Sequence, residues 1–131
     1  MYLPIAQRNR IVDAYTARCN SGVIRCYTGA RPANGDAAQT GTLLGTLTFG
    51  ATAFGGASSG TATANAITQD SSADADGTIG HVAVYESGGT TLVGYFTVGT
   101  SGAEFNFNTL AVSTGQPISC TSATISIGGG A

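Results

Sequence analysis

Residues 78–99, TIGHVAVYESGGTTLVGYFTVG, predict a long β-hairpin around which the rest of the chain must pack. Two runs rich in β-branched and aromatic residues flank SGGT at 87–90, where the Gly-Gly pair suits the positive φ angles of a tight hairpin turn. In a symmetric register, one face of the hairpin is nearly all apolar: Ile79, Ala83, Tyr85, Leu92, Phe96 and Val98. We expect this face to form the core with Phe105 and Phe107.

The opposite face of the hairpin is also partly apolar, through Val82, Val84, Val93 and Tyr95. A strand pair that is apolar on both sides needs a cover on each side. The sequence leaves two covers open for this second face, a helix of the same chain or another subunit.

The pattern of the whole chain predicts one mainly β domain over 1–131, with a helix or arm at 1–20, a β-sandwich at 22–127 and a flexible tail at 128–131. Seven or eight short strands separated by turns about every 8 to 12 residues are typical of antiparallel sandwiches and jelly rolls. Besides the hairpin, we expect strands at 22–28, 42–49, 61–68, 104–108 and 118–127. In the strand at 42–49, alternation places Leu43, Gly45, Leu47 and Phe49 inward.

Residues 4–19, PIAQRNRIVDAYTARC, predict the helix, because Pro4 suits a first turn and an apolar stripe follows it. The stripe consists of Ile5, Ile11, Val12, Tyr15 and Cys19, and the other face carries Arg8, Arg10 and Arg18. Such an amphipathic helix needs an apolar surface. We expect it to lie across its own sheet, and docking on a neighbouring subunit is the alternative.

Two further segments are candidate contact sites. Arg31 lies in a long loop that begins GARPANGD at residue 29, and it could anchor a partner's carboxylate or simply be solvated. The expected strand at 61–68, TATANAIT, is flat and has no guarding charge. A free edge of this kind invites pairing, so we expect a cover over Thr61, Thr63 and Asn65, and a partner subunit would provide one.

Composition excludes several partners. Only 9% of residues are charged, and the net charge of −2 with a pI near 4.9 argues against nucleic-acid binding, which depends on neutralising phosphates. No apolar stretch is long enough to predict a membrane span or a signal peptide, so we expect folding in a cytoplasm. All five cations are arginines in the first quarter of the chain. This asymmetry suits head-to-tail contact between copies, or it cancels within one fold.

Candidate catalytic and metal-binding patterns are weak. GASSG at 56–60 matches G-x-S-x-G, and Asp70 and His81 follow Ser58 in the order of a hydrolase triad, but the flanks predict loop and strand. Asp70, Asp74 and Asp76 resemble half of a calcium loop that lacks its final glutamate. The three cysteines have no metal-ligand spacing and are expected to be reduced and mostly buried. The sequence therefore predicts no enzyme, no cofactor and no metal site.

Several stretches together resemble a family of small proteins encoded among the virion-structure genes of tailed bacteriophages and prophages. They cover nearly the whole chain: the N-terminal helix, YTGARP at 27–32, LLGTLTF at 43–49, AFGGASSGTATANAIT at 53–68, the Asp-rich 70–78, VGTSGAEFNFNT at 98–109 and a final strand of small residues.

The resemblance implies a virion structural protein on the capsid exterior, specifically a capsid decoration or cement protein. Its implied partners are the major capsid protein and neighbouring copies of itself, which predicts a homo-oligomer in the assembled particle. Two alternatives stay open. One is a tail or head-tail joining component, and the other is an adhesin module that binds a host glycan, although the chain has no Trp for stacking sugars.

Overall fold

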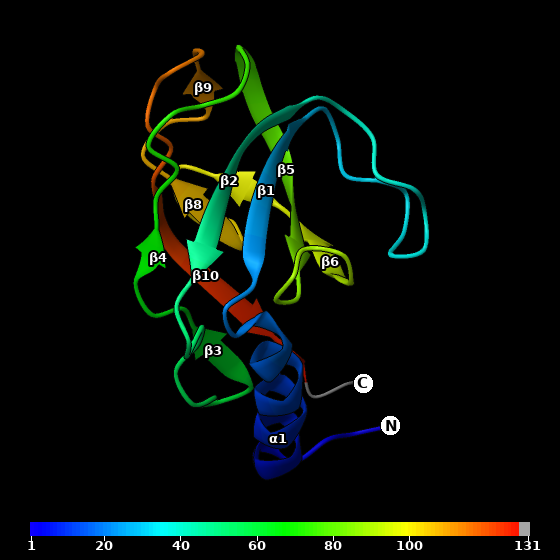
Figure 1. Ribbon diagram of the computed structural model, residues 1–131. Helices are drawn as coiled ribbons and strands as arrows, with labels where there is room; N and C mark the ends of the chain where they lie inside the picture. The colour runs from blue at the N-terminus through cyan, green and yellow to red at the C-terminus, as the bar shows by residue number, and fades with distance from the viewer. Residues whose placement is uncertain (129–131) are drawn as a thin grey trace.

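A computed structural model of the chain describes residues 1–128, and these form two β-sheets with one helix at their end (Figure 1). The larger sheet has the order β4 (Ile67–Thr68), β2 (Leu43–Phe49), β1 (Val23–Thr28), β5 (Gly77–Tyr85) and β6 (Leu92–Phe96). In addition, β9 (Ala111–Val112) pairs with the start of β5. The smaller sheet has the order β3 (Thr61–Thr63), β10 (Cys120–Ser126), β8 (Phe105–Phe107) and β7 (Val98–Gly99).

The fold is mainly β and sandwich-like, as the sequence predicts. Every pairing between strands is antiparallel except that of β7 with β8. Residues 1–128 form ten strands where seven or eight are expected, because two expected strands are interrupted and β9 forms in a segment expected to turn. Of the expected tail at 128–131, residues 129–131 lie outside the described part of the chain.

The core lies between the two sheets and contains aromatic and aliphatic side chains from both. Phe105 is fully buried, with its ring centroid 5.1 Å from that of Phe96 and 6.4 Å from that of Phe49. The other fully buried large side chains of this cluster are aliphatic or aromatic: Val12, Ile24, Leu44, Leu47, Ile79, Val82, Val84, Phe107 and Ile118. Phe105 and Phe107 therefore take the inward positions that their alternation predicts.

The hairpin at 78–99 forms, and Ile79 and Phe96 face the core as predicted, but the two faces are exchanged over the middle of the hairpin. Tyr85 pairs with Leu92 as expected, whereas Val84 then pairs with Gly94, so that Val93 is an extra residue in β6. Val82 and Val84 lie in the core, and Ala83 and Tyr85 lie on the outer face of the sheet. The prediction of an Ala83–Tyr85 core face was wrong, and the second sheet of this chain covers Val82 and Val84.

Two more single-residue bulges redirect side chains in the larger sheet. Gly80 is extra in β5, between the pairs Tyr27↔His81 and Thr28↔Ile79, so Ile79 joins the core while His81 faces outward. Leu44 is extra in β2 and is fully buried, whereas Leu43 is only half-buried. The inward position predicted for Leu43 therefore belongs to Leu44. A bulge reverses the alternation of every residue beyond it.

The N-terminal helix is confirmed as α1 (Ile5–Thr16), followed by a 3₁₀ turn (Ala17–Cys19). It covers the end of the two sheets near β3 and β10 rather than the face of either sheet (Figure 1). Val12 and Thr16 are the buried side chains of α1, and Cys19 in the 3₁₀ turn is buried as well. Ile5 and Ile11 are exposed, so only part of the predicted apolar stripe packs on this chain.

The expected strand at 61–68 is split, which corrects the prediction of one flat, unguarded strand. Its first half is β3 in the smaller sheet and its second half is β4 in the larger sheet, so the chain crosses between the sheets at 64–66. The outer edge of β3 is covered by residues 54–58, because the Gly55 N–H donates to the Thr63 carbonyl and Ser58 pairs with Thr61. The edge of β3 is therefore covered by a segment of the same chain.

Candidate interaction surfaces

The arginines of the helix differ in their surroundings. Arg10 and Arg18 are exposed, whereas Arg8 is half-buried beside the turn at 58–60, and its Nε has no hydrogen-bond partner. Two backbone N–H groups hold residues 57–60 to the helix. That of Gly60 donates to Asn9 Oδ1 at 2.8 Å, and that of Ala57 donates to Asp13 Oδ1 at 2.8 Å. Arg10 and Arg18 remain open to a partner.

Tyr15 is tied to its own chain. Its hydroxyl donates to the carbonyl of Val93 at 2.7 Å and so anchors the helix to the bulge of β6. Burial of the side chain, with smaller contributions from Cys19 and Glu104, raises the pKa of Tyr15. The hydroxyl therefore forms a structural bond within the chain.

Large apolar side chains are exposed at the start of the chain and on α1. The exposed fractions are 89% for Met1, 81% for Tyr2, 50% for Ile5 and 40% for Ile11. Among the described residues these are the large hydrophobic side chains that the fold leaves exposed. A contiguous patch of exposed apolar side chains marks a contact surface, whereas single exposed apolar side chains are common. We call these four residues the apolar arm.

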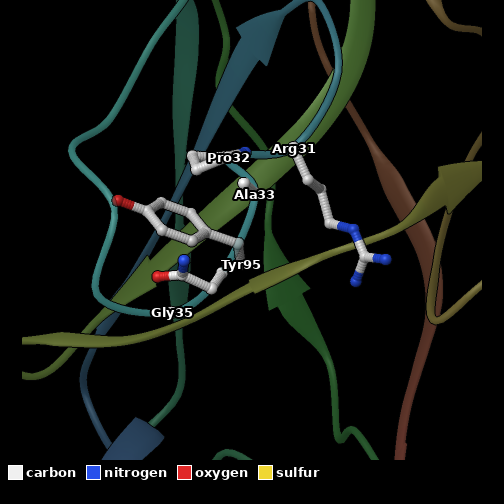
Figure 2. A pocket seen from close by; sticks show the side chains of 6 residues that line it. Arg31, Pro32, Ala33, Gly35 and Tyr95 are labelled. Atoms are coloured by element: carbon white, nitrogen blue, oxygen red, sulfur yellow. The ribbon is translucent and has the colours of Figure 1, made fainter.

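The loop at 29–42 is a surface loop, as predicted, and it folds back over β6 (Figure 1). The Tyr95 hydroxyl donates to the Ala37 carbonyl at 3.0 Å, and a pocket of about 170 Å³ lies between that ring and residues 31–35. Figure 2 shows Tyr95 next to Pro32 and Ala33, with the Arg31 guanidinium directed away from the ring. Arg31 Nη1 lies 3.9 Å from Glu104 Oε1, an oxygen that already accepts two bonds from Thr97.

His81 holds the loop at 29–42 in place through contacts with Gly29 and Gln39. It is fully buried, its Nδ1 lies 2.9 Å from the Gly29 carbonyl oxygen, and its Nε2 lies 2.9 Å from Gln39 Nε2. This pattern fits a neutral ring protonated at Nδ1, which donates to Gly29 and accepts from Gln39. The histidine is therefore a hydrogen-bonded structural residue.

The three contact residues predicted on the strand at 61–68 differ in their exposure. Thr61 is half-buried, with Oγ1 2.8 Å from Ser126 Oγ, and Thr63 is exposed. Asn65 is exposed at the crossing between the sheets, where its side chain donates to the Thr52 carbonyl at 3.0 Å. Thr63 and Asn65 are accessible, but they lie on a segment that the chain already pairs.

A cluster on the outer face of β1, β5 and β6 was missed by sequence reasoning. Tyr27 stacks on His81 at 5.6 Å, His81 meets Tyr95 edge-on at 6.2 Å, and the Arg25 guanidinium carbon lies 4.5 Å from the Tyr85 ring centroid. We call the four half-buried residues Arg25, Tyr27, Tyr85 and Tyr95 the arginine–tyrosine face. Its members are far apart in sequence, so only the strand register could have revealed it.

The candidate catalytic residues make separate structural bonds. Ser58 lies in the turn before β3, and His81 bonds the loop at 29–42. Asp70 Oδ2 accepts from the Thr46 N–H at 2.8 Å, while its Oδ1 accepts from the Ser72 N–H at 2.9 Å. Asp76 accepts from the N–H and hydroxyl of Thr114, and these bonds lower the pKa of its carboxyl. In the described part of the chain, no three His, Cys, Asp or Glu side chains gather to hold a metal.

The cysteines are free, with Cys19 and Cys26 buried and Cys120 half-buried. Burial raises the pKa of Cys19 to about 12 and that of Cys120 to about 11, and it raises the pKa of Cys26 as well. The thiolate is the reactive form, so all three side chains behave as packing residues near neutral pH.

Comparison with known protein families, with curated proteins and with solved structures gives no match to this chain. Within residues 1–128, no helix has the length and apolar character that crossing a membrane requires.

Proposed function

We propose that this protein is a structural component of a tailed-phage virion, and specifically a capsid decoration or cement protein that binds the major capsid shell. The observation that carries the proposal is the apolar arm, which leaves Met1, Tyr2, Ile5 and Ile11 exposed on an otherwise well-packed 13.0 kDa molecule. A protein whose role is to bind a large assembly needs such a surface and needs no catalytic group.

The sequence resemblance and the low charge support the same proposal. Only 9% of the residues are charged, so contact with a flat partner desolvates few ions. Of the three contacts suggested by the sequence, the edge at 61–63 is paired within the chain, which favours α1 and the loop around Arg31. The protein would then act on the capsid exterior after folding in the host cytoplasm.

The test is a binding assay between the purified protein and empty heads of the phage that encodes it. We expect saturable co-sedimentation with heads, and we expect the double variant Ile5→Ser/Ile11→Ser to weaken it at least about tenfold, because burying two such side chains contributes a few kcal/mol. Both residues are exposed, so we expect the double variant to keep the melting temperature of the unmodified protein.

The matched control is Thr48→Ser, a conservative change at an exposed position on β2. It should bind as the unmodified protein does. Protein that fails to sediment with heads, or a double variant that binds with unchanged affinity, contradicts the proposal.

A host-glycan-binding module is the second candidate, because the arginine–tyrosine face gathers three of the five tyrosines. Sugars bind on aromatic rings that have a polar group nearby. Specific binding on a glycan array that is lost in Tyr95→Ala would favour this candidate. A tail or head-tail joining component would sit at a different place in the virion from a capsid decoration protein. Counting the copies of the protein per particle distinguishes these two roles.

A further inference from the structure

The loop at 29–42 contains the one Asn-Gly sequence of the chain, Asn34-Gly35. Both residues are exposed, and a Cβ built on Gly35 would meet no atom within 4 Å. The loop is held to the sheet on either side of this pair, through the hydrogen bonds of His81 and Tyr95. The pair therefore lies in an open loop tip between two fixed points, and exposed tips of this kind tolerate changes of the chain.

The turn at this tip prepares the Asn34 side chain for attack by the next backbone nitrogen. Asn34 Oδ1 accepts from the Asp36 N–H at 2.9 Å. This bond draws electron density from Asn34 Cγ and supplies a donor for the oxyanion that forms when a nucleophile attacks this carbon. Within residues 1–128 no hydrogen bond engages the Gly35 N–H. The Gly35 nitrogen is therefore open to react, and its bond to Cγ would close a succinimide ring.

The structure also shows why two similar pairs of this chain do not react in this way. Asp76 precedes a glycine too, but Thr114 donates to its carboxylate and lowers the pKa of the carboxyl, and an ionised carboxylate is a poor electrophile. Asn20 precedes the small residue Ser21, but the Ser21 N–H donates to the Gly50 carbonyl at 2.9 Å. The nitrogen that would attack Asn20 is thus engaged, which leaves Asn34 as the reactive position.

We propose that Asn34 is a modification site at which the chain deamidates spontaneously, with water as the co-reactant. The Gly35 nitrogen loses its proton and forms a bond to Asn34 Cγ, and the side-chain nitrogen takes up a proton and leaves as ammonia. Water then adds to one of the two carbonyl carbons of the succinimide ring, and the bond from that carbon to the ring nitrogen breaks. Opening at Cγ gives aspartate, and opening at the main-chain carbonyl carbon gives isoaspartate. Nothing is oxidised or reduced in either route.

Deamidation changes both the charge and the backbone of the loop. Each conversion replaces a neutral amide with a carboxylate, in the pocket that Asn34 lines together with Arg31 and Tyr95. Isoaspartate also routes the backbone through its side-chain carbons, which adds a methylene group to the chain between the two fixed points. The surface that the loop presents therefore changes as the protein ages. This inference does not depend on the proposed function, because the reaction needs no partner.

Incubation of the purified full-length protein in mildly alkaline buffer tests the proposal. Peptide mapping by mass spectrometry should show NH replaced by O at Asn34, and an L-isoaspartyl methyltransferase should label the isoaspartate. In mildly acidic buffer the conversion should slow, because the attacking nitrogen must lose its proton. Asn34 should react at least about tenfold faster than the asparagines that no glycine follows. These internal controls are Asn9, Asn20, Asn65, Asn106 and Asn108. An Asn34 that stays intact, or that reacts no faster than the controls, overturns the proposal.

Two variants of the same loop test the route through the succinimide. Gly35→Ala should fold, because its Cβ has open space, and should deamidate at least about tenfold more slowly, because the methyl group hinders the nitrogen and restricts the rotation that ring closure needs. The matched control is Ala38→Ser, a conservative change at an exposed position outside the reacting pair, and it should react as the unmodified protein does. Equal rates in Gly35→Ala and Ala38→Ser would contradict attack by the Gly35 nitrogen.

Discussion

Replacing Val84 with lysine is expected to abolish folding of the isolated protein. Val84 is fully buried between the two sheets, in one cluster with Phe105 and Phe107. A lysine there would leave an ammonium group without a partner in the core, or would lose its proton at a similar free-energy cost. We expect a loss of at least about 4 kcal/mol, which is comparable with the whole stability of a small domain.

The measurement is the circular dichroism spectrum and thermal transition of purified Val84→Lys. The matched control is Thr48→Lys, which places the same side chain at an exposed position on β2, two strands away in the same sheet. It should stay within about 0.5 kcal/mol of the unmodified protein. A folded Val84→Lys protein that fails only in assembly would mean that this face meets another subunit instead.

Replacing Gly80 with alanine is expected to destabilise the fold by about 3 kcal/mol or more. A Cβ on Gly80 would collide with the carbonyl oxygen of Gly29 and would lie 2.7 Å from its carbonyl carbon. Backbone atoms cannot move aside as a flexible side chain can, so either the bulge in β5 or the start of the loop at 29–42 must shift. The hydrogen bond between His81 and Gly29 would be disturbed at the same point.

Urea unfolding checks this result, with stability read from the midpoint at an unchanged slope. Gly35→Ala is the matched control, because a Cβ at Gly35 meets no atom within 4 Å. It should change stability by no more than about 0.5 kcal/mol. A Gly80→Ala midpoint equal to that of the control would mean that loop and strand are not packed as described.

The sequence predicted the elements well and the faces of the strands poorly. Alternating apolar residues located the hairpin and the Phe105–Phe107 strand, and the stripe from Ile5 to Cys19 located the helix. Single-residue bulges at Leu44, Gly80 and Val93 then exchanged inward and outward positions. Alternation assumes an uninterrupted period of two, so it cannot detect an inserted residue. A glycine inside a strand pattern, as at Gly80, was the one available signal.

The candidate surfaces were predictable only where they are local in sequence. The arginines of α1 and the loop around Arg31 were recognised because each lies within one segment. The arginine–tyrosine face joins Arg25 and Tyr27 to Tyr85 and Tyr95 through the register of three strands. That register cannot be predicted from the sequence alone. The split of the segment at 61–68 between two sheets was missed for the same reason, since its partners are distant along the chain.

The proposed virion role is tested most directly by cryo-electron microscopy of particles of the phage proposed to encode this protein. We expect density for a two-sheet domain on the outside of the head, present in many copies over capsomer junctions, with the α1 end and its apolar arm against the shell. Heads without this domain, or a domain seated with α1 facing solvent, would contradict it.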